Sequence, residues 1–284
     1  MQINNRYFEG ERPLYGCRDI ALRDVTIGKG ESALKQCRGI RAEQCTFQGM
    51  YVLWECENVQ CSHCLFAASD RAPLWYGRNI RLHNCSIDAP KALRELDGLD
   101  IVNTHITNAA ESLWFCRNGQ LTDVRMDSAE YAFFQSADMQ INRLRLQGRY
   151  AFQYARGIEI HDAVLDTKDA FWESRDCTIY DSQIKGEYLG WYAKNLKLVR
   201  CHISGTQPLC YCENLILEDC TLAPDADLAF EYSTLHATIL STVTSIKNPT
   251  SGSIVCKSCN ELIRDTFARQ PDDCSIIMTD STVL

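Results

Sequence analysis

Two consecutive stretches of the sequence, "CRGIRAEQCTF" (37–47) and "CENVQCSHCLF" (56–66), decide the fold. They align without a gap, so that cysteine stands opposite cysteine at both ends of the pattern. The second stretch also holds a C-x-x-C pair, Cys61 and Cys64, with His63 between them. Such a pair can belong to a metal site, a redox centre or a disulfide, or it can be a product of the repeat itself. The rest of the chain distinguishes these interpretations.

The same pattern recurs along the chain with a step of 19 to 21 residues. Taking the fourth residue of each segment as an anchor gives Ile20, Ile40, Val59, Ile80, Leu99, Gly119, Met139, Ile158, Cys177, Leu196 and Leu215, with a weaker twelfth at Leu235. Apolar residues stand at the anchor and two, five and seven positions after it, which indicates two short strands separated by a polar bend. Asp, Asn or Gly precedes the anchor in eleven of these twelve segments, and these residues tolerate a left-handed turn. The pattern therefore predicts an all-β fold, a parallel β-helix of about twelve coils.

The repeat also suggests how the ends are organised. Residues 1–16 do not follow it and are predicted to form an N-terminal cap, because an open solenoid end exposes core and strand edges. The β-helix is expected over 17–244, and 245–284 is expected to form a C-terminal cap within the same single domain. In that cap, "SCNELIRDTFARQ" (258–270) is predicted as a short helix and "CSIIMTD" (274–280) as a final strand.

Composition narrows the function. The 284 residues carry a net charge of −8 with no basic run, so neither a nucleic acid nor an anionic membrane surface is an expected partner. No stretch approaches the ~18 apolar residues of a membrane span, and the N-terminus lacks the apolar segment of a signal peptide. Sixteen cysteines without an export signal predict free thiols in the cytoplasm.

The cysteines fall into two columns of the repeat. Cys17, Cys37, Cys56, Cys116 and Cys212 lie three residues before the anchor, and Cys45, Cys64, Cys85, Cys201 and Cys220 lie five after it. Other coils place Ser, Ala, Gly, Val, Thr or Leu there, which is typical of an interior column. The C-x-x-C pair is thus interpreted as core packing, and neither a metal nor a cofactor is predicted.

One pair of columns is rich in aromatic residues. The column five residues before the anchor reads Lys35, Trp54, Trp75, Arg94, Trp114, Phe134, Gln153, Trp172, Trp191, Cys210 and Phe230 and contains every tryptophan of the chain. The next column reads Gln36, Glu55, Tyr76, Glu95, Phe115, Gln135, Tyr154, Glu173, Tyr192, Tyr211 and Glu231. The column before the tryptophans, from Leu34 to Leu209, is mostly apolar and is predicted to face inward. Whether the tryptophans themselves face out or in is left open by the strand pattern.

Exposed aromatic rings interleaved with carboxylates suit a sugar chain, a subunit interface or simple packing against the strands. The candidate ligand-binding residues are Trp172, Trp191, Glu173, Tyr192, Trp114 and Tyr154.

The bend four residues after the anchor supplies candidate catalytic groups. Asp162 and Asp181 occupy it on successive coils and should lie about 5 Å apart, with Arg143 one coil earlier. Two carboxylates so placed can divide acid and base roles between them. Asp is also the ordinary residue of such a bend.

The segments "GESALKQ" (30–36), "KDAFWES" (168–174), "GEYLGWYAKNL" (186–196), "LAFEYS" (228–233) and "SIKNPTSG" (245–252) resemble an uncharacterised bacterial family of about 280 residues, known only as a domain of unknown function. The similarity covers essentially the whole chain. It implies a single-domain, right-handed parallel β-helix of the pectate-lyase type in a bacterial cytoplasmic protein, and it brings no catalytic residues.

The sequence thus favours a binding or scaffold protein whose aromatic face meets an oligosaccharide or a second subunit. The alternative is an intracellular carbohydrate-active enzyme, a hydrolase, lyase or isomerase, with Asp162 and Asp181 as its acid–base pair. An enzyme needs carboxylates and rings in one cleft, and the repeat places them at different corners of the coil, which favours binding.

Overall fold

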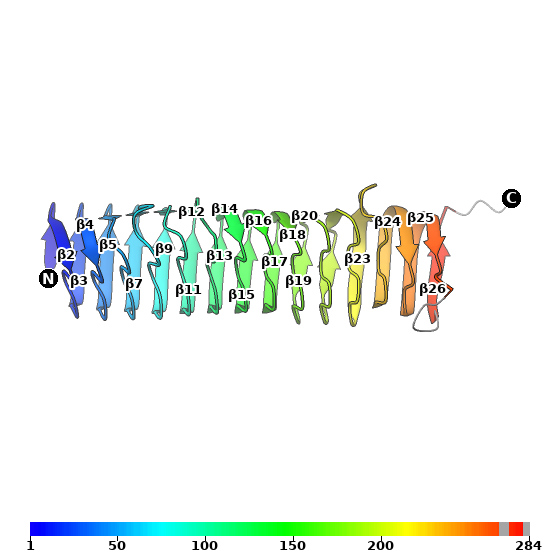
Figure 1. Cartoon of the computed structure of the whole chain (residues 1–284), viewed down its shortest axis with the longest axis horizontal. Helices are drawn as coiled ribbons and strands as arrows, with labels where there is room; N and C mark the ends of the chain where they lie inside the picture. The colour runs from blue at the N-terminus through cyan, green and yellow to red at the C-terminus, as the bar shows by residue number, and fades with distance from the viewer. Residues whose placement is uncertain (267–272, 281–284) are drawn as a thin grey trace. The chain divides into compact units, whose positions relative to one another are not determined.

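The computed structural model describes residues 1–266 and 273–280. The described residues contain no helix, and therefore none long and apolar enough to cross a membrane. The fold is a parallel β-solenoid. The chain divides into two compact units, residues 1–148 and 149–284, and each is built from coils whose strands lie side by side (Figure 1).

In the first unit, one side of the coils forms a parallel sheet, called here the first sheet. Its strands pair in order as β1 (Gln2–Asn4), β3 (Arg18–Arg23), β5 (Arg38–Glu43), β7 (Glu57–Ser62), β9 (Arg78–His83), β11 (Asp97–Val102), β13 (Arg117–Thr122) and β15 (Ala137–Asn142). A second sheet follows the bend and contains β2 (Tyr7–Glu11), β4 (Thr26–Glu31), β6 (Thr46–Phe47), β8 (Leu65–Phe66), β10 (Ser86–Ile87), β12 (His105–Ile106) and β14 (Arg125–Glu130). The strand β16 (Arg145–Arg149) ends at the division between the units.

The second unit repeats this plan. Its first sheet contains β17 (Arg156–His161), β19 (Thr178–Tyr180), β21 (Lys197–Val199), β23 (Leu215–Leu222), β24 (Thr234–Lys247), β25 (Ser251–Ile263) and β26 (Asp273–Met278). Its second sheet contains β18 (Val164–Lys168), β20 (Gln183–Lys185) and β22 (His202–Ser204), and β22 pairs with the end of β23.

Inward columns supply the core of each coil. Ile40, Val59 and Ile80 are buried on the first sheet, and Phe47 stacks on Phe66 beneath the second, with ring centroids 4.8 Å apart. The first sheet alternates buried and exposed residues as the period-2 pattern predicts, for example in β5, β7 and β9. The predicted turn before the anchor is confirmed, since Asn58 and Asn79 have φ near 55°.

The ends differ from the sequence-based prediction. The segment 1–16, expected to be a cap, forms β1 and β2, which pair in parallel with β3 and β4 as further coil strands. The segment 245–284 likewise contains β25 and β26, so the described residues form more coils than the twelve predicted. The helix predicted at 258–270 is wrong over 258–263, where β25 pairs with β24, and 267–270 lie outside the described residues. Parallel pairing to the preceding coil there outweighs local helix preference. The final strand is confirmed as β26, and the right-handedness stays a prediction.

Candidate functional site

The third side of each coil, called here the aromatic face, is made of turns that precede each strand of the first sheet. The backbone dihedral φ is positive at every second residue of these turns. In one coil, Tyr51, Leu53 and Glu55 all have φ between 54° and 60°. Bulky residues rarely adopt this conformation, and hydrogen bonds between coils hold it, from Leu53 N to Ala33 O and from Glu55 N to Trp75 O.

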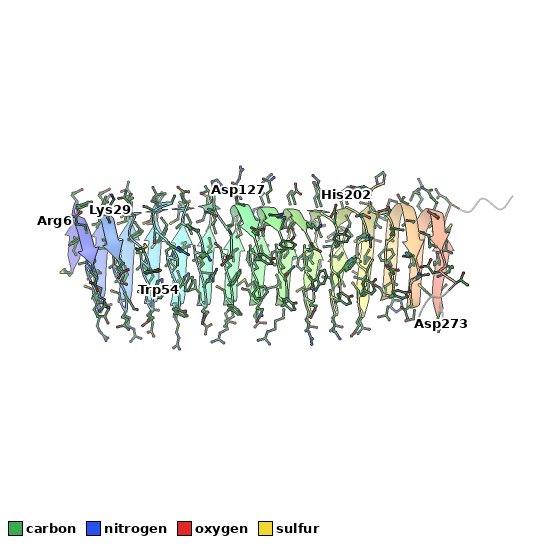
Figure 2. All side chains as sticks on the ribbon, in the orientation of Figure 1. Arg6, Lys29, Trp54, Asp127, His202 and Asp273 are labelled. Atoms are coloured by element: carbon green, nitrogen blue, oxygen red, sulfur yellow. The ribbon has the colours of Figure 1, made fainter. Side chains whose placement is uncertain are left out.

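These turns sort three neighbouring columns by depth. The leucine and phenylalanine column is fully buried, as predicted, with Leu53 and Phe152 at 0% exposure. The tryptophan column is half-buried, and the column after it is exposed in most coils. The tryptophans thus face neither fully inward nor fully outward. They line the flank of the coil, and the residue that follows each of them projects into solvent. Figure 2 shows Trp54 on the side of the coils, away from the edge where Lys29 and Asp127 project.

The tryptophans form a fixed inner layer. Four of the five indole N–H groups donate to backbone carbonyls of the next coil, among them those of Trp54, to Ala72 at 2.5 Å, and Trp191, to Gln207 at 2.8 Å. Trp54 and Trp75 stack at 5.1 Å and 7°, so each covers a face of the other. The Arg94 guanidinium lies 4.0 Å from the ring centroid of Trp114, in a cation–π contact. Indole rings whose faces and N–H groups already have partners support the exposed residues above them, and they offer little free ring surface to a ligand.

The exposed rings stand on this layer. Tyr76 packs edge-to-face against Trp54 and Trp75 at 5.5 and 5.9 Å, and Phe115 against Trp114 at 6.2 Å. In the second unit Tyr192 packs on Trp172 at 5.7 Å and on Trp191 at 6.3 Å. The exposed fractions of Tyr76, Phe115, Tyr154 and Tyr192 are 43, 44, 43 and 44%. Supporting contacts of this kind fix ring orientation before any ligand arrives.

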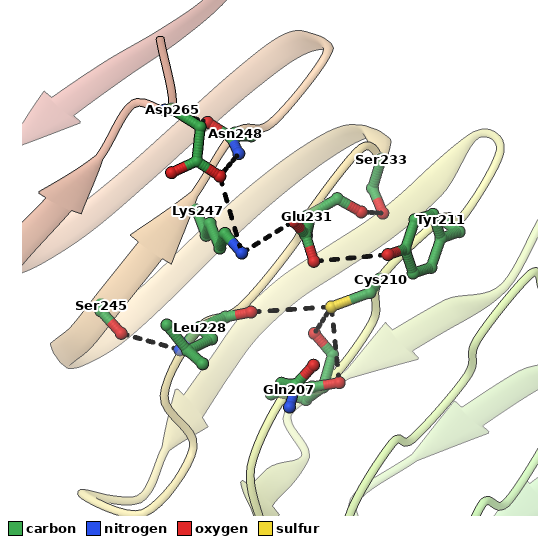
Figure 3. Close-up of polar contacts among 11 residues, drawn as sticks. Gln207, Cys210, Tyr211, Leu228, Glu231, Ser233, Ser245, Lys247, Asn248 and Asp265 are labelled. Carbon is green, nitrogen blue, oxygen red and sulfur yellow. Dashed lines mark hydrogen bonds and ion pairs between the residues drawn. The ribbon is translucent and has the colours of Figure 1, made fainter. Parts of the chain in front are cut away.

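Four glutamates share the exposed column, and their environments differ. The carboxylate of Glu55 accepts from Gln36 Nε2 at 2.6 Å and lies 3.3 Å from Lys35 Nζ. The hydrogen bond from Gln36, with help from Lys35, lowers the pKa of Glu55. Glu231 is held by Lys247 Nζ at 2.9 Å and Tyr211 Oη at 3.4 Å, within the polar network that Figure 3 draws.

Glu95 and Glu173 have no such partner. Among the described residues, neither carboxylate makes an ion pair or side-chain hydrogen bond. Each lies between two exposed rings in its column, Glu95 between Tyr76 and Phe115, and Glu173 between Tyr154 and Tyr192. We call these two sets the ring–carboxylate–ring triads. Glu95 and Phe115 also line a hollow of about 400 Å³ that is bordered by Arg117.

Three of the predicted ligand residues, Tyr154, Glu173 and Tyr192, form the second triad. The other three, Trp114, Trp172 and Trp191, lie in the supporting layer. The first triad was not singled out from the sequence. Its alternation of ring, carboxylate and ring was visible there, but its significance depends on knowing which column is exposed.

The predicted catalytic residues lie elsewhere on the coil. Asp162 and Asp181 follow β17 and β19 on adjacent coils, at left-handed positions with φ of 54° and 50°. Asp181 forms a two-pronged ion pair with Arg200, both contacts 2.6 Å, and the hydrogen-bonded guanidinium lowers the pKa of Asp181. A carboxylate kept ionised in this way suits a turn better than a general acid. Arg143 binds Asp123 in the same manner, at 2.6 and 2.7 Å.

These aspartates are separated from the rings by the first sheet. Trp172 precedes β19 and Asp181 follows it, and a strand rises about 3.3 Å per residue. The carboxylates and the aromatic face therefore occupy different corners of the coil.

The cysteine columns are interior. All sixteen thiols are free, and fourteen of them are buried. Burial raises the pKa of Cys116 to about 12 and that of Cys177 to about 11. No group of three or more potential metal-ligating side chains is present among the described residues.

Residues 1–277 match the protein family described as "Protein of unknown function (DUF3737)". The chain belongs to this DUF3737 family. The resemblance drawn from the sequence is thereby confirmed, and the family description assigns no activity. No curated protein matches the sequence.

Several solved structures are similar to this chain at low sequence identity. The surface adhesin PfbA of Streptococcus pneumoniae is 12% identical, with a TM-score of 0.39 over 92% of this chain and 73% of that one. The A-module of the mannuronan C-5 epimerase AlgE4 of Azotobacter vinelandii is 10% identical, with a TM-score of 0.33 over 98% and 87%. HetL, a pentapeptide repeat protein of the cyanobacterium Nostoc, is 14% identical, with a TM-score of 0.30 over 75% and 88%.

Proposed function

We propose that this protein is a binding protein whose aromatic face takes a carbohydrate at the two ring–carboxylate–ring triads. The observation that carries the proposal is the contrast within one column. Glu55 and Glu231 are bound by neighbouring side chains, whereas Glu95 and Glu173, each placed between two exposed rings, have no partner among the described residues.

The dimensions of a triad fit a sugar ring. Its two aromatic residues are two coils apart, or about 9–10 Å at the backbone. A pyranose can place its C–H faces against one or both rings, while the carboxylate between them accepts hydrogen bonds from its hydroxyls. Tyr76, Phe115 and Tyr192 already pack against the tryptophan layer, so little conformational entropy of these rings is lost on binding.

An enzymatic role has less support. The acid–base pair would require Asp181 to act while Arg200 binds both of its oxygens, and the rings that would hold a sugar lie across the first sheet from it. A subunit interface would use the same exposed tyrosine and phenylalanine side chains, and the experiment below separates it from carbohydrate binding. A cytoplasmic location is part of the proposal and rests on the cysteine content.

The test is a thermal-shift titration of the full chain with gluco-, manno- and galacto-configured tetrasaccharides and a tetrasaccharide of uronic acids. A ligand that binds the folded protein raises Tm with its concentration. We expect at least one saccharide to do so, and Glu173→Gln, Glu95→Gln and Tyr192→Ala to weaken its binding about tenfold or more, since each removes a hydrogen bond to a charged group or a ring contact.

Glu55→Gln is the matched control, because it makes the same substitution in the same column at a carboxylate that already has partners; its affinity should equal that of the wild type. If no saccharide shifts Tm while sedimentation velocity shows a concentration-dependent oligomer that Tyr192→Ala dissociates, the face is a subunit interface and the carbohydrate proposal is wrong.

A further inference from the structure

A second surface, on the first sheet of the first unit, carries two arginines that have no partner in the described part of the chain. Arg41 on β5, Gln60 on β7 and Arg81 on β9 lie in register on successive coils. All three are exposed, while the residues on either side of each, such as Ile40 and Ala42, are buried. Their side chains therefore project from the same side of the sheet.

Three other arginines of this sheet are paired with carboxylates. Arg38 pairs with Glu57 at 3.4 Å, Arg117 with Asp97 at 3.0 Å, and Arg23 with Glu43 at 3.9 Å. Among the residues that the structure describes, Arg41 and Arg81 have neither an ion pair nor a side-chain hydrogen bond.

The acidic group best placed to neutralise Arg81 is used elsewhere. Asp100 stands opposite Arg81 in register on β11. Its carboxylate instead contacts His83 Nε2 at 3.2 Å. The two guanidinium groups thus keep their full donor capacity.

The surface around these arginines is hollowed. Three adjoining hollows of about 470, 410 and 380 Å³ lie along it, and Gln60 lines all three. Arg41 lines the first and third, and Arg81 the second and third, so they form one groove. Small residues open it, since Gly39 borders the first hollow and Gly98 the second.

We infer that this groove binds an anionic group, a phosphate, sulfate or carboxylate, between Arg41 and Arg81 over the amide of Gln60. The two arginines are two coils apart, about 9–10 Å at the backbone, and each side chain is long enough to cross one coil spacing toward the centre. Guanidinium groups present paired N–H donors that match the oxygens of such an anion, and the amide of Gln60 adds a third donor.

The net charge of the chain is −8, so the protein as a whole does not attract anions. Binding must come from these local contacts and should depend on them.

The experiment is isothermal titration calorimetry of the full chain at fixed ionic strength in chloride, with inorganic phosphate and with glucose 6-phosphate as the probes. We expect both to bind the wild type. Arg41→Gln and Arg81→Gln should each weaken binding about tenfold, and the double variant should abolish measurable heat. Arg6→Gln, the same charge change at an exposed site outside the first sheet, is the control and should leave the affinity unchanged.

The two probes distinguish the source of the anion. If glucose 6-phosphate binds more tightly than phosphate and the Arg41→Gln/Arg81→Gln double variant loses this binding, the groove reads an anionic group carried on a larger ligand. Equal binding of the two probes means that a free anion suffices. The inference is overturned if neither probe binds at millimolar concentration, or if Arg6→Gln weakens binding as much as Arg41→Gln. Glu95→Gln and Glu173→Gln should leave phosphate binding intact, so this result is independent of the carbohydrate proposal.

Discussion

At the scale of single residues, Asp70 is a buried carboxyl group in an apolar environment. Its side chain is fully buried, and neither carboxyl oxygen has a hydrogen-bond partner among the described residues. Burial raises the pKa of Asp70 well above its usual value, and the nearby backbone N–H of Val52 opposes this shift only in part. Because the folded state binds the proton more tightly than the unfolded chain, stability is highest below the unfolded pKa of about 4 and falls as the pH rises towards the folded pKa.

Asp70→Asn should therefore raise the free energy of unfolding, and the gain should grow by up to about 1.4 kcal/mol per pH unit above pH 4 until the folded pKa is reached. Urea unfolding of the two proteins between pH 4 and 8 measures the difference. Asp138→Asn, at an exposed left-handed position, should leave the pH profile parallel to that of the wild type. A parallel profile for Asp70→Asn as well would mean that Asp70 is solvated or paired.

At the scale of the repeated element, the cysteine columns are predicted to be chemically inert. Fourteen thiols are buried, and only Cys17 and Cys259 are half-exposed. Burial raises the pKa of Cys116 to about 12, which leaves about one thiol in ten thousand ionised at pH 8. Native labelling with a thiol reagent at pH 8 should modify two cysteines quickly, and peptide mapping should identify Cys17 and Cys259. Labelling in denaturant should reach all sixteen. Rapid native modification of Cys64 would instead mark the C-x-x-C pair as reactive.

The repeated element also explains what the sequence could predict and what it could not. The strand columns followed from apolar residues at alternate positions, because strands such as β5 and β7 obey the ordinary alternation of a strand. The aromatic face does not obey it. Every second residue of this turn has a left-handed backbone conformation. As a result, Leu53 points inward, Trp54 lies on the flank of the coil and Glu55 is exposed. A pattern that assumes strand geometry therefore leaves the direction of the tryptophans open, and with it the choice of ligand residues.

At the scale of the whole molecule, sequence periodicity predicted the solenoid but made it too short, because coil strands also form in the segments predicted to be caps. Residues 1–16 and 245–263 lack the apolar signature of the repeat, yet β1 and β25 still pair in parallel with strands of the adjoining coils. A terminal coil contacts one neighbour only, so its outward residues need not be apolar. Backbone pairing, which leaves little trace in side-chain pattern, decides the structure there.

The same nearest-neighbour logic predicts that one entire coil can be removed. Glu57 and Arg78 occupy equivalent positions, so deleting residues 57–77 joins Cys56 to Arg78 and stacks β5 directly on β9. Buried apolar residues then meet buried apolar residues, for example Ile40 and Ile80. We expect a folded protein whose Tm is lower by about 5–10 °C, because one coil interface is lost while the others persist.

Deleting only residues 57–66 removes two sides of a coil and leaves its turn, which breaks the register of the following coils. Thermal melts followed by circular dichroism should show a cooperative transition for the first deletion and none for the second. Loss of the transition in both would mean that the coils are coupled beyond their neighbours.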